Sequence, residues 1–167
     1  RLFNAHIHTG LTMNQLTKSF DSVSICLSKG LGSPVGSLLV ADQLTIDKAH
    51  RLRKMLGGGM RQVGVIASCG MYALENNIQR LQVDHDNAKL LASGLASIEE
   101  LSIEFDDSQT NMVFVNCPEL DRAKLEKFLF ENEIIVSNLK RGRLVCHLGI
   151  DEKDILFVID TFKDYFK

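Results

Sequence analysis

Residues 23–37 read VSICLSKGLGSPVGS, and this stretch decides what fold and what chemistry we expect of the chain. An apolar run of strand type ends at Ser28 and Lys29, and three glycines and a proline follow. A second apolar run begins directly afterwards, at residues 38–40. This pattern predicts a strand, a tight turn and a second strand. Lys29 therefore stands at the end of a strand, beside glycines that let other groups approach the backbone closely.

A lysine in this position has two interpretations when the stretch is considered alone. Partial desolvation would lower its pKa, and the free amine could then form an imine with a carbonyl compound. The alternative is a solvated lysine in a hairpin turn, and this is the commoner case because perturbed lysines are a minority.

The stretch around Lys29 resembles the cofactor-lysine segment of the threonine aldolases, which are pyridoxal-phosphate (PLP) enzymes of the aspartate-aminotransferase fold type. Residues 1–5, RLFNA, resemble the end of the family's Asp-Gly-Ala-Arg segment and its continuation. Residues 53–62, RKMLGGGMRQ, resemble its glycine-rich basic loop. The similarity continues in order along essentially the whole chain, through residues 72–74, 84–88, 110–112 and 143–148.

The resemblance implies an α/β fold in two parts. Residues 1–87 would form the C-terminal part of a PLP-dependent transferase-like large domain, mainly a parallel sheet with helices. Residues 88–167 would form a small α+β domain with helices on one face of a sheet. The resemblance also implies that the family's N-terminal half is missing, with its phosphate loop, ring-stacking histidine and the aspartate that pairs with the pyridine nitrogen. We therefore expect a C-terminal fragment that is inactive alone.

The same resemblance implies roles for five residues. Lys29 would carry the cofactor, PLP. Arg1 and Arg143 would bind the substrate carboxylate, Arg61 would reach the cofactor phosphate of a neighbouring subunit, and Lys54 would lie near the active site. From the residues alone, the glycine run at 57–59 before a helix and an arginine predicts either an anion site or a flexible linker. The general base is not identified.

The function implied is that of a PLP-dependent aldolase, which cleaves L-threonine or L-allo-threonine to glycine and acetaldehyde in threonine catabolism and glycine biosynthesis. The partners implied are a small amino-acid substrate and further copies of the chain, arranged as a homotetramer built as a dimer of dimers. Two alternatives stay open: another PLP lyase of the same fold type that catalyses β-elimination, and a non-catalytic remnant or interaction module.

Composition narrows the remaining classes of protein. The 167 residues are 45% hydrophobic and 24% charged with a net charge of −2, which is typical of globular domains and argues against a nucleic-acid partner. No apolar run is long enough to predict a membrane span. The four cysteines form no CxxC pair, so we expect buried reduced thiols, no metal site and a cytoplasmic protein, with organelle targeting left open.

Periodicity predicts the order of the elements. We expect residues 1–9 to be a strand-to-loop segment, in which His6 and His8 could share a face but lack a third metal ligand. His85 is expected to be solvated or capping rather than a catalytic base. Helices are expected at residues 11–20, 43–54, 60–95 with a break at 76–77, 121–131, and from 151 onward; strands are expected at 101–105, 112–116, 134–137 and 143–148.

Overall fold

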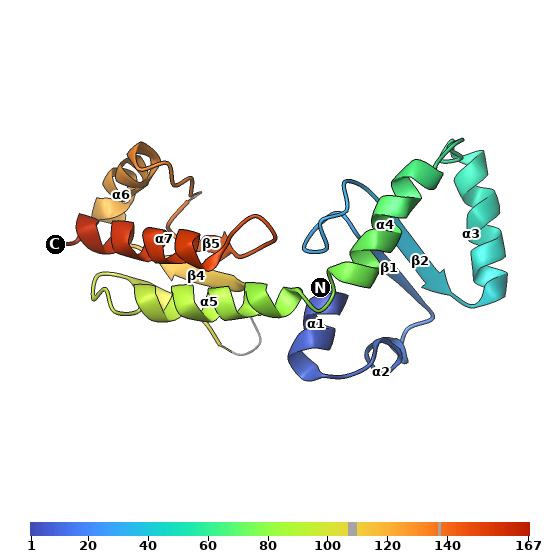
Figure 1. Ribbon diagram of the computed structural model, residues 1–167, viewed down its shortest axis with the longest axis horizontal. Coiled ribbons are helices and arrows are strands. Elements are labelled where there is room, and N and C mark those ends of the chain that lie inside the picture. Colours follow the sequence, from blue (N-terminus) through green and yellow to red (C-terminus); the bar gives the residue numbers. More distant parts are fainter. Residues whose placement is uncertain (107–109, 137) are drawn as a thin grey trace. The chain divides into compact units, whose positions relative to one another are not determined.

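The computed structural model describes residues 1–106, 110–136 and 138–167, and it divides into two compact units. Unit 1 comprises Arg1–Leu81 and unit 2 comprises Gln82–Lys167 (Figure 1). The division falls between residues 81 and 82, whereas the sequence placed the domain boundary between 87 and 88. Each unit is described by itself. None of the helices in the described residues is long and apolar enough to cross a membrane.

Unit 1 is built around a two-stranded hairpin with helices before and after it. The strands pair antiparallel, with Val23 opposite Val40 and Cys26 opposite Ser37, which confirms the strand–turn–strand prediction. The elements in order are α1 (Leu2–Thr9), α2 (Met13–Thr17), β1 (Ser22–Cys26), β2 (Ser37–Ala41), α3 (Gln43–Met55) and α4 (Gly64–Asn76).

The core of unit 1 is small and lies under the turn between β1 and β2. Its buried apolar side chains are Phe3, Leu27, Leu31, Ala73 and Leu81. α3 contributes no buried residue, although Asp42 caps its N-terminus by accepting a 2.8 Å hydrogen bond from the Thr45 N–H. Most of the buried side chains of unit 1 therefore pack around this turn.

Unit 2 is a three-stranded antiparallel sheet with helices packed on it. The strand order is β3–β4–β5, with Ile103 opposite Val115 and Val113 opposite Leu144. Side chains of α5, α6 and α7 join those of β4 in one buried cluster, and α5 and α7 run alongside the strands in Figure 1. The elements are α5 (Leu81–Leu95), β3 (Ser102–Glu104), β4 (Met112–Asn116), α6 (Glu119–Glu131), β5 (Gly142–Val145) and α7 (Glu152–Tyr165).

α7 shows how local sequence fixes an element of unit 2. The Asp151 side chain accepts a 3.0 Å hydrogen bond from the Asp154 N–H, and the Asp154 side chain accepts one of 2.9 Å from the Asp151 N–H. These reciprocal bonds satisfy donors that the first turn leaves open. The expected stripe then packs inward, with Ile155, Ile159 and Phe162 buried.

Four expectations about the elements are wrong or need revision. Residues 1–9 form a helix rather than a strand-to-loop segment, and Gly10 ends it in the left-handed conformation with φ 69°. The segment 60–95 contains two helices separated at residues 77–80, which confirms the break at Asn76 and Asn77 but moves the first start to residue 64. Residues 134–136 form no strand, and Ser137 lies outside the described residues. All strand pairs of the described residues are antiparallel, so the mainly parallel sheet expected of the large domain is not formed by these strands.

The histidine and cysteine expectations also change. His6 and His8 lie on helix α1, and His6 Nδ1 lies 2.7 Å from the Leu11 carbonyl oxygen, so the strand face proposed for them does not exist. His85 is buried, in contrast to the solvated residue expected, because α5 turns it into the protein. Cys117 and Cys146 are buried as expected, whereas Cys26 is exposed.

Candidate active site

Lys29 lies in the turn that follows β1, and the backbone around it is closely hydrogen-bonded. The Gly32 N–H donates to the Lys29 carbonyl at 2.8 Å, the Ser33 N–H donates to the Leu27 carbonyl at 3.1 Å, and the Leu27 N–H donates to Gly36 at 3.0 Å. The Lys29 side chain is exposed, while its neighbours Leu27 and Leu31 are buried. The turn therefore holds the backbone of Lys29 still and leaves the amine accessible.

Two of the turn's glycines are required by its backbone. Gly32 has φ 73° and Gly36 has φ 129°, and both values lie in the region that side chains disfavour. Gly30 serves packing instead, because a Cβ atom on it would lie 3.2 Å from Leu81 Cδ2. These features explain why the turn carries so many glycines around one lysine.

The C-terminal half of α4, with Asn77 directly after it, packs against the turn that carries Lys29. The Asn77 side chain donates a 2.7 Å hydrogen bond from Nδ2 to the Leu31 carbonyl. A Cβ atom on Gly70 would lie 3.0 Å from Leu27 Cδ1, so helix and turn pack closely at this point. Asn77 was assigned only to a helix break from the sequence; the signal available was an amide residue just after an apolar helix, which is common in caps.

Arg1 lies within electrostatic reach of the same turn. Burial lowers the pKa of the Arg1 amino group, and the positive charges of the Arg1 guanidinium and then of Lys29 lower it further. The charge of Lys29 therefore acts on the backbone amino group of Arg1. Their shared positive charge suits an anionic ligand.

The glycine-rich basic loop lies at the other end of α4. Gly57 has φ 80°, and the Gly58 N–H donates a 2.8 Å hydrogen bond to the Arg53 carbonyl, so the loop folds back over the end of α3. The Lys54 side chain lies across Gly59, with Nζ 3.3 Å from the position a Cβ atom would take. Arg61 is exposed, three residues before α4 begins.

The length of α4 separates this loop from Lys29 within one chain. α4 has 13 residues, and at about 1.5 Å per residue it is roughly 20 Å long. The Lys29 turn contacts its C-terminal half through Gly70 and Asn77, whereas Arg61 precedes its N-terminus (Figure 1). Within unit 1, the Lys29 turn and Arg61 therefore lie toward different ends of α4.

Arg143 lies in unit 2, on the face of the sheet that the helices leave open. It pairs with Phe114 of β4, so both side chains are on that face. The next residue, Leu144, points the other way into the core. Arg143 is exposed and makes no hydrogen bond or ion pair with any residue that the structure describes. Its guanidinium is therefore available for an outside ligand.

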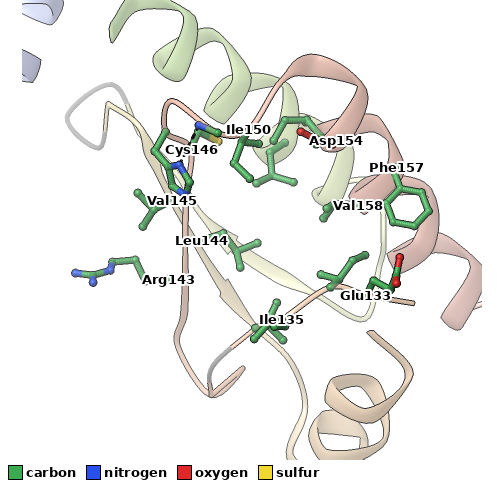
Figure 2. A pocket seen from close by; sticks show the side chains of 16 residues that line it. Glu133, Ile135, Arg143, Leu144, Val145, Cys146, Ile150, Asp154, Phe157 and Val158 are labelled. Atoms are coloured by element: carbon green, nitrogen blue, oxygen red, sulfur yellow. Dashed lines mark hydrogen bonds between the residues drawn. The ribbon is translucent and has the colours of Figure 1, made fainter. Parts of the chain in front are cut away.

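A cavity of about 570 Å³ borders β5. It is lined mainly by apolar side chains of α7 and of residues 134–136, with Glu133 and Asp154 among them. Figure 2 shows Arg143 at the rim, with its side chain pointing away from Leu144 and Phe157. Arg143 therefore belongs to the rim of the cavity, while its guanidinium points away from the apolar lining.

Buried polar residues support the strand that carries Arg143. The Asn111 side chain donates a 2.8 Å hydrogen bond to the Cys146 carbonyl, and the Cys146 N–H donates at 3.0 Å to the Asn111 carbonyl. Burial, and next the charge of Asp84, raise the pKa of the Cys146 thiol to about 12. Sequence analysis assigned no separate role to Asn111, and the signal available was a polar residue directly before an apolar strand.

The beta-eliminating lyase family matches residues 1–118 of the chain. The chain belongs to this family. It is 44% identical over 98% of its length to "Low-specificity L-threonine aldolase 1" of Arabidopsis thaliana, covering 47% of that protein. It is 43% identical over 93% of its length to "Low specificity L-threonine aldolase" of Escherichia coli (strain K12), covering 46% of that protein. The resemblance seen in the sequence is therefore confirmed, and the chain spans about half the length of the curated relatives it matches.

Solved structures with a similar fold support the expected fold class. The model matches a putative L-allo-threonine aldolase from Listeria monocytogenes with a TM-score of 0.78 at 19% identity, covering 98% of this chain and 50% of that one. A putative aromatic amino acid beta-eliminating lyase/threonine aldolase from Exiguobacterium also gives 0.78, at 17% identity, covering 99% and 51%. These matches confirm the expected fold class. The roles of Lys29, Arg61, Lys54, Arg1 and Arg143 stay predictions.

Proposed function

We propose that this chain supplies the cofactor-lysine half of a PLP-dependent aldolase that cleaves L-threonine or L-allo-threonine to glycine and acetaldehyde. One observation carries the proposal: Lys29 stands exposed on a turn whose backbone is held by hydrogen bonds and by the buried side chains of Leu27 and Leu31. The names of the relatives at 43–44% identity support the substrate class. Because the chain spans about half of their length, the activity is proposed for a protein of full length.

The residues present fit PLP. An aldehyde cofactor needs a primary amine that is reachable and fixed at its base, and Lys29 meets both conditions. A phosphate needs cations, and the exposed side chains of Arg61 and Lys54 offer them at the glycine-rich loop. When bound, PLP supplies the electron sink for the carbanion left by cleavage of the Cα–Cβ bond.

The chain's own residues then have separate tasks. The Lys29 amine holds the cofactor, and its fixed backbone limits where the cofactor can sit. The guanidinium groups of Arg1 and Arg143 bind the substrate carboxylate, and such a hold orients the bond to be broken. We assign the removal of the β-hydroxyl proton to no residue of this chain.

We further propose that the active protein is a homo-oligomer, a dimer of dimers, in which Arg61 serves the site of a neighbouring subunit. The placement of Lys29 and Arg61 near opposite ends of α4, roughly 20 Å long, supports this arrangement. Three exposed apolar residues near the loop, Met55, Leu56 and Met60, are between 62% and 84% exposed and are suited to an interface. We place the reaction in threonine breakdown to glycine, in the cytoplasm.

The second candidate is β-elimination, favoured by the family that matches residues 1–118. The two reactions leave different products, since β-elimination releases a 2-oxo acid and ammonia whereas aldol cleavage of threonine releases glycine and acetaldehyde. The test is a product analysis of the full-length protein with PLP and L-threonine, L-allo-threonine or L-serine. Glycine from the threonines supports the aldolase, and a 2-oxo acid as main product supports the lyase.

The 167-residue chain assayed alone with PLP should release no glycine from threonine. Its residues supply the lysine but hold no group here assigned to stack on or tune the cofactor ring, and such groups control its electronics. Glycine release by the chain alone would contradict this expectation. A full-length protein that binds no PLP would instead favour a non-catalytic role.

A further inference from the structure

Arg143 stands on a sheet face that also carries an acidic side chain. Glu104 pairs with Phe114 from one side, and Arg143 pairs with Phe114 from the other. Directly paired residues share a face, so Glu104 and Arg143 flank the same ring. Their backbones are about 10 Å apart, two strand spacings, which their long side chains could bridge.

Arg141 prevents this pairing in the structure. Its Nη2 lies 3.0 Å from Glu104 Oε2, and its guanidinium carbon lies 5.1 Å from the centroid of the Phe114 ring. The Arg141 guanidinium thus interacts with both the Phe114 ring and the Glu104 carboxylate. Arg143, two residues further on, pairs with no described residue.

We propose that Arg141 is a positioning residue for substrate recognition, which holds Glu104 and thereby keeps the Arg143 guanidinium open for the substrate carboxylate. This rests on the proposed function of Arg143. The Arg141–Glu104 pair adds little to stability because its side chains are 66% and 45% exposed. Its effect is electrostatic: without Arg141, Glu104 would compete with substrate for Arg143.

The experiment compares four full-length holoenzymes by their kinetics with L-threonine: wild type, Arg141→Gln, Glu104→Gln and the double variant. Arg141→Gln should raise KM about threefold, the size expected for one exposed charge interaction, with kcat nearly unchanged. The double variant should return KM to the wild-type value. Lys140→Gln is the matched control, because it removes a neighbouring exposed charge that does not hold Glu104 and should leave KM unchanged.

A crystal structure of the Arg141→Gln protein gives a readout that is independent of activity. It should show the Glu104 carboxylate within 4 Å of the Arg143 guanidinium, the usual limit for an ion pair. If Arg143→Ala itself leaves KM unchanged, the proposed role of Arg143 fails. If Arg143→Ala raises KM but Arg141→Gln does not, if Glu104→Gln fails to rescue it, or if Glu104 stays away from Arg143, the role of Arg141 is overturned.

Discussion

At the scale of the residue, Lys29 combines an exposed amine with a backbone fixed by its neighbours. Borohydride reduction of the PLP-loaded full-length protein, followed by peptide mass mapping, should place a pyridoxyl mass on Lys29, because reduction makes its bond to the cofactor permanent. Lys29→Ala should remove both the adduct and the activity. Lys54→Ala, the control, should keep the adduct on Lys29. A pyridoxyl mass on Lys54 in the wild type would reassign the cofactor lysine.

The proposed role of Arg143 in binding the substrate carboxylate can also be tested with a single substitution. Arg143→Ala in the full-length protein should lower kcat/KM for threonine about 10- to 150-fold, mainly through KM. This corresponds to about 1.5–3 kcal/mol for a lost charge-assisted hydrogen-bonding pair. Steady-state kinetics measure it, with Lys140→Ala, an exposed lysine in the turn before β5, as the control. A change below about threefold would place Arg143 among ordinary exposed arginines.

The different burial of Cys26 and Cys146 predicts that their thiols react at different rates with an alkylating reagent. Cys26 is exposed, whereas burial raises the pKa of the Cys146 thiol to about 12 from an ordinary value of 9.0. Iodoacetamide at neutral pH should label Cys26 and leave Cys146 unlabelled until the protein unfolds, as mass mapping can show. The unfolded thiol ionises near pH 9 and the folded one near 12, so Cys146 lowers stability as pH rises between these values. Equal labelling of both thiols would contradict the burial of Cys146.

At the scale of the element, α5 and α7 pack closely where Gly94 meets Ile159. A Cβ atom on Gly94 would lie 2.7 Å from Ile159 Cγ1 and 2.9 Å from Cγ2, and the β-branched side chain cannot turn aside easily. Gly94→Ala should therefore cost about 1–3 kcal/mol of overpacking, which exceeds the gain of about 1 kcal/mol in helix propensity. Urea unfolding of the full-length protein measures the change.

The control for that pair of helices is Gly64 at the start of α4. No atom lies within 4 Å of a Cβ built on it, and its φ is not positive. Gly64→Ala should leave the free energy of unfolding unchanged or raise it by up to about 1 kcal/mol. If both alanines stabilise the protein, the close contact of α5 with α7 is not present in solution.

At the scale of the whole molecule, the separation of Lys29 and Arg61 predicts complementation between subunits. Full-length Lys29→Ala and Arg61→Ala should each be nearly inactive as homo-oligomers. After mixing, unfolding and reassembly, half of the dimers are mixed and each has one intact site, which gives about a quarter of wild-type activity. Lys29→Ala mixed with Arg1→Ala is the control and should recover nothing, because we propose that Arg1 and Lys29 serve the same site from one chain. No recovery with Arg61→Ala would place Arg61 in its own subunit's site.

The sequence by itself determined the elements whose signals are local. Alternation and glycines predicted the β1–β2 hairpin, and an N-terminal aspartate with an apolar stripe predicted α7, because caps and periodicity act within a few residues. It did not predict α1, which has no side-chain cap and no acidic residue in its first turn. The apolar run 134–136 was taken for a strand because sequence cannot show whether a partner edge is within reach.

Only the tertiary structure decided which distant residues meet. Asn77 holds the carbonyl of Leu31, 46 positions away, and Arg141 holds Glu104, 37 positions away. Neither contact leaves a pattern along the chain, because the register of strands and the packing of helices set them. The sequence thus determined the family, the fold and the candidate lysine. The structure decided that the Lys29 turn packs on α4 through Gly70 and Asn77, that Arg61 precedes the other end of that helix, and that Arg141 holds Glu104 beside Phe114, the residue that pairs with Arg143.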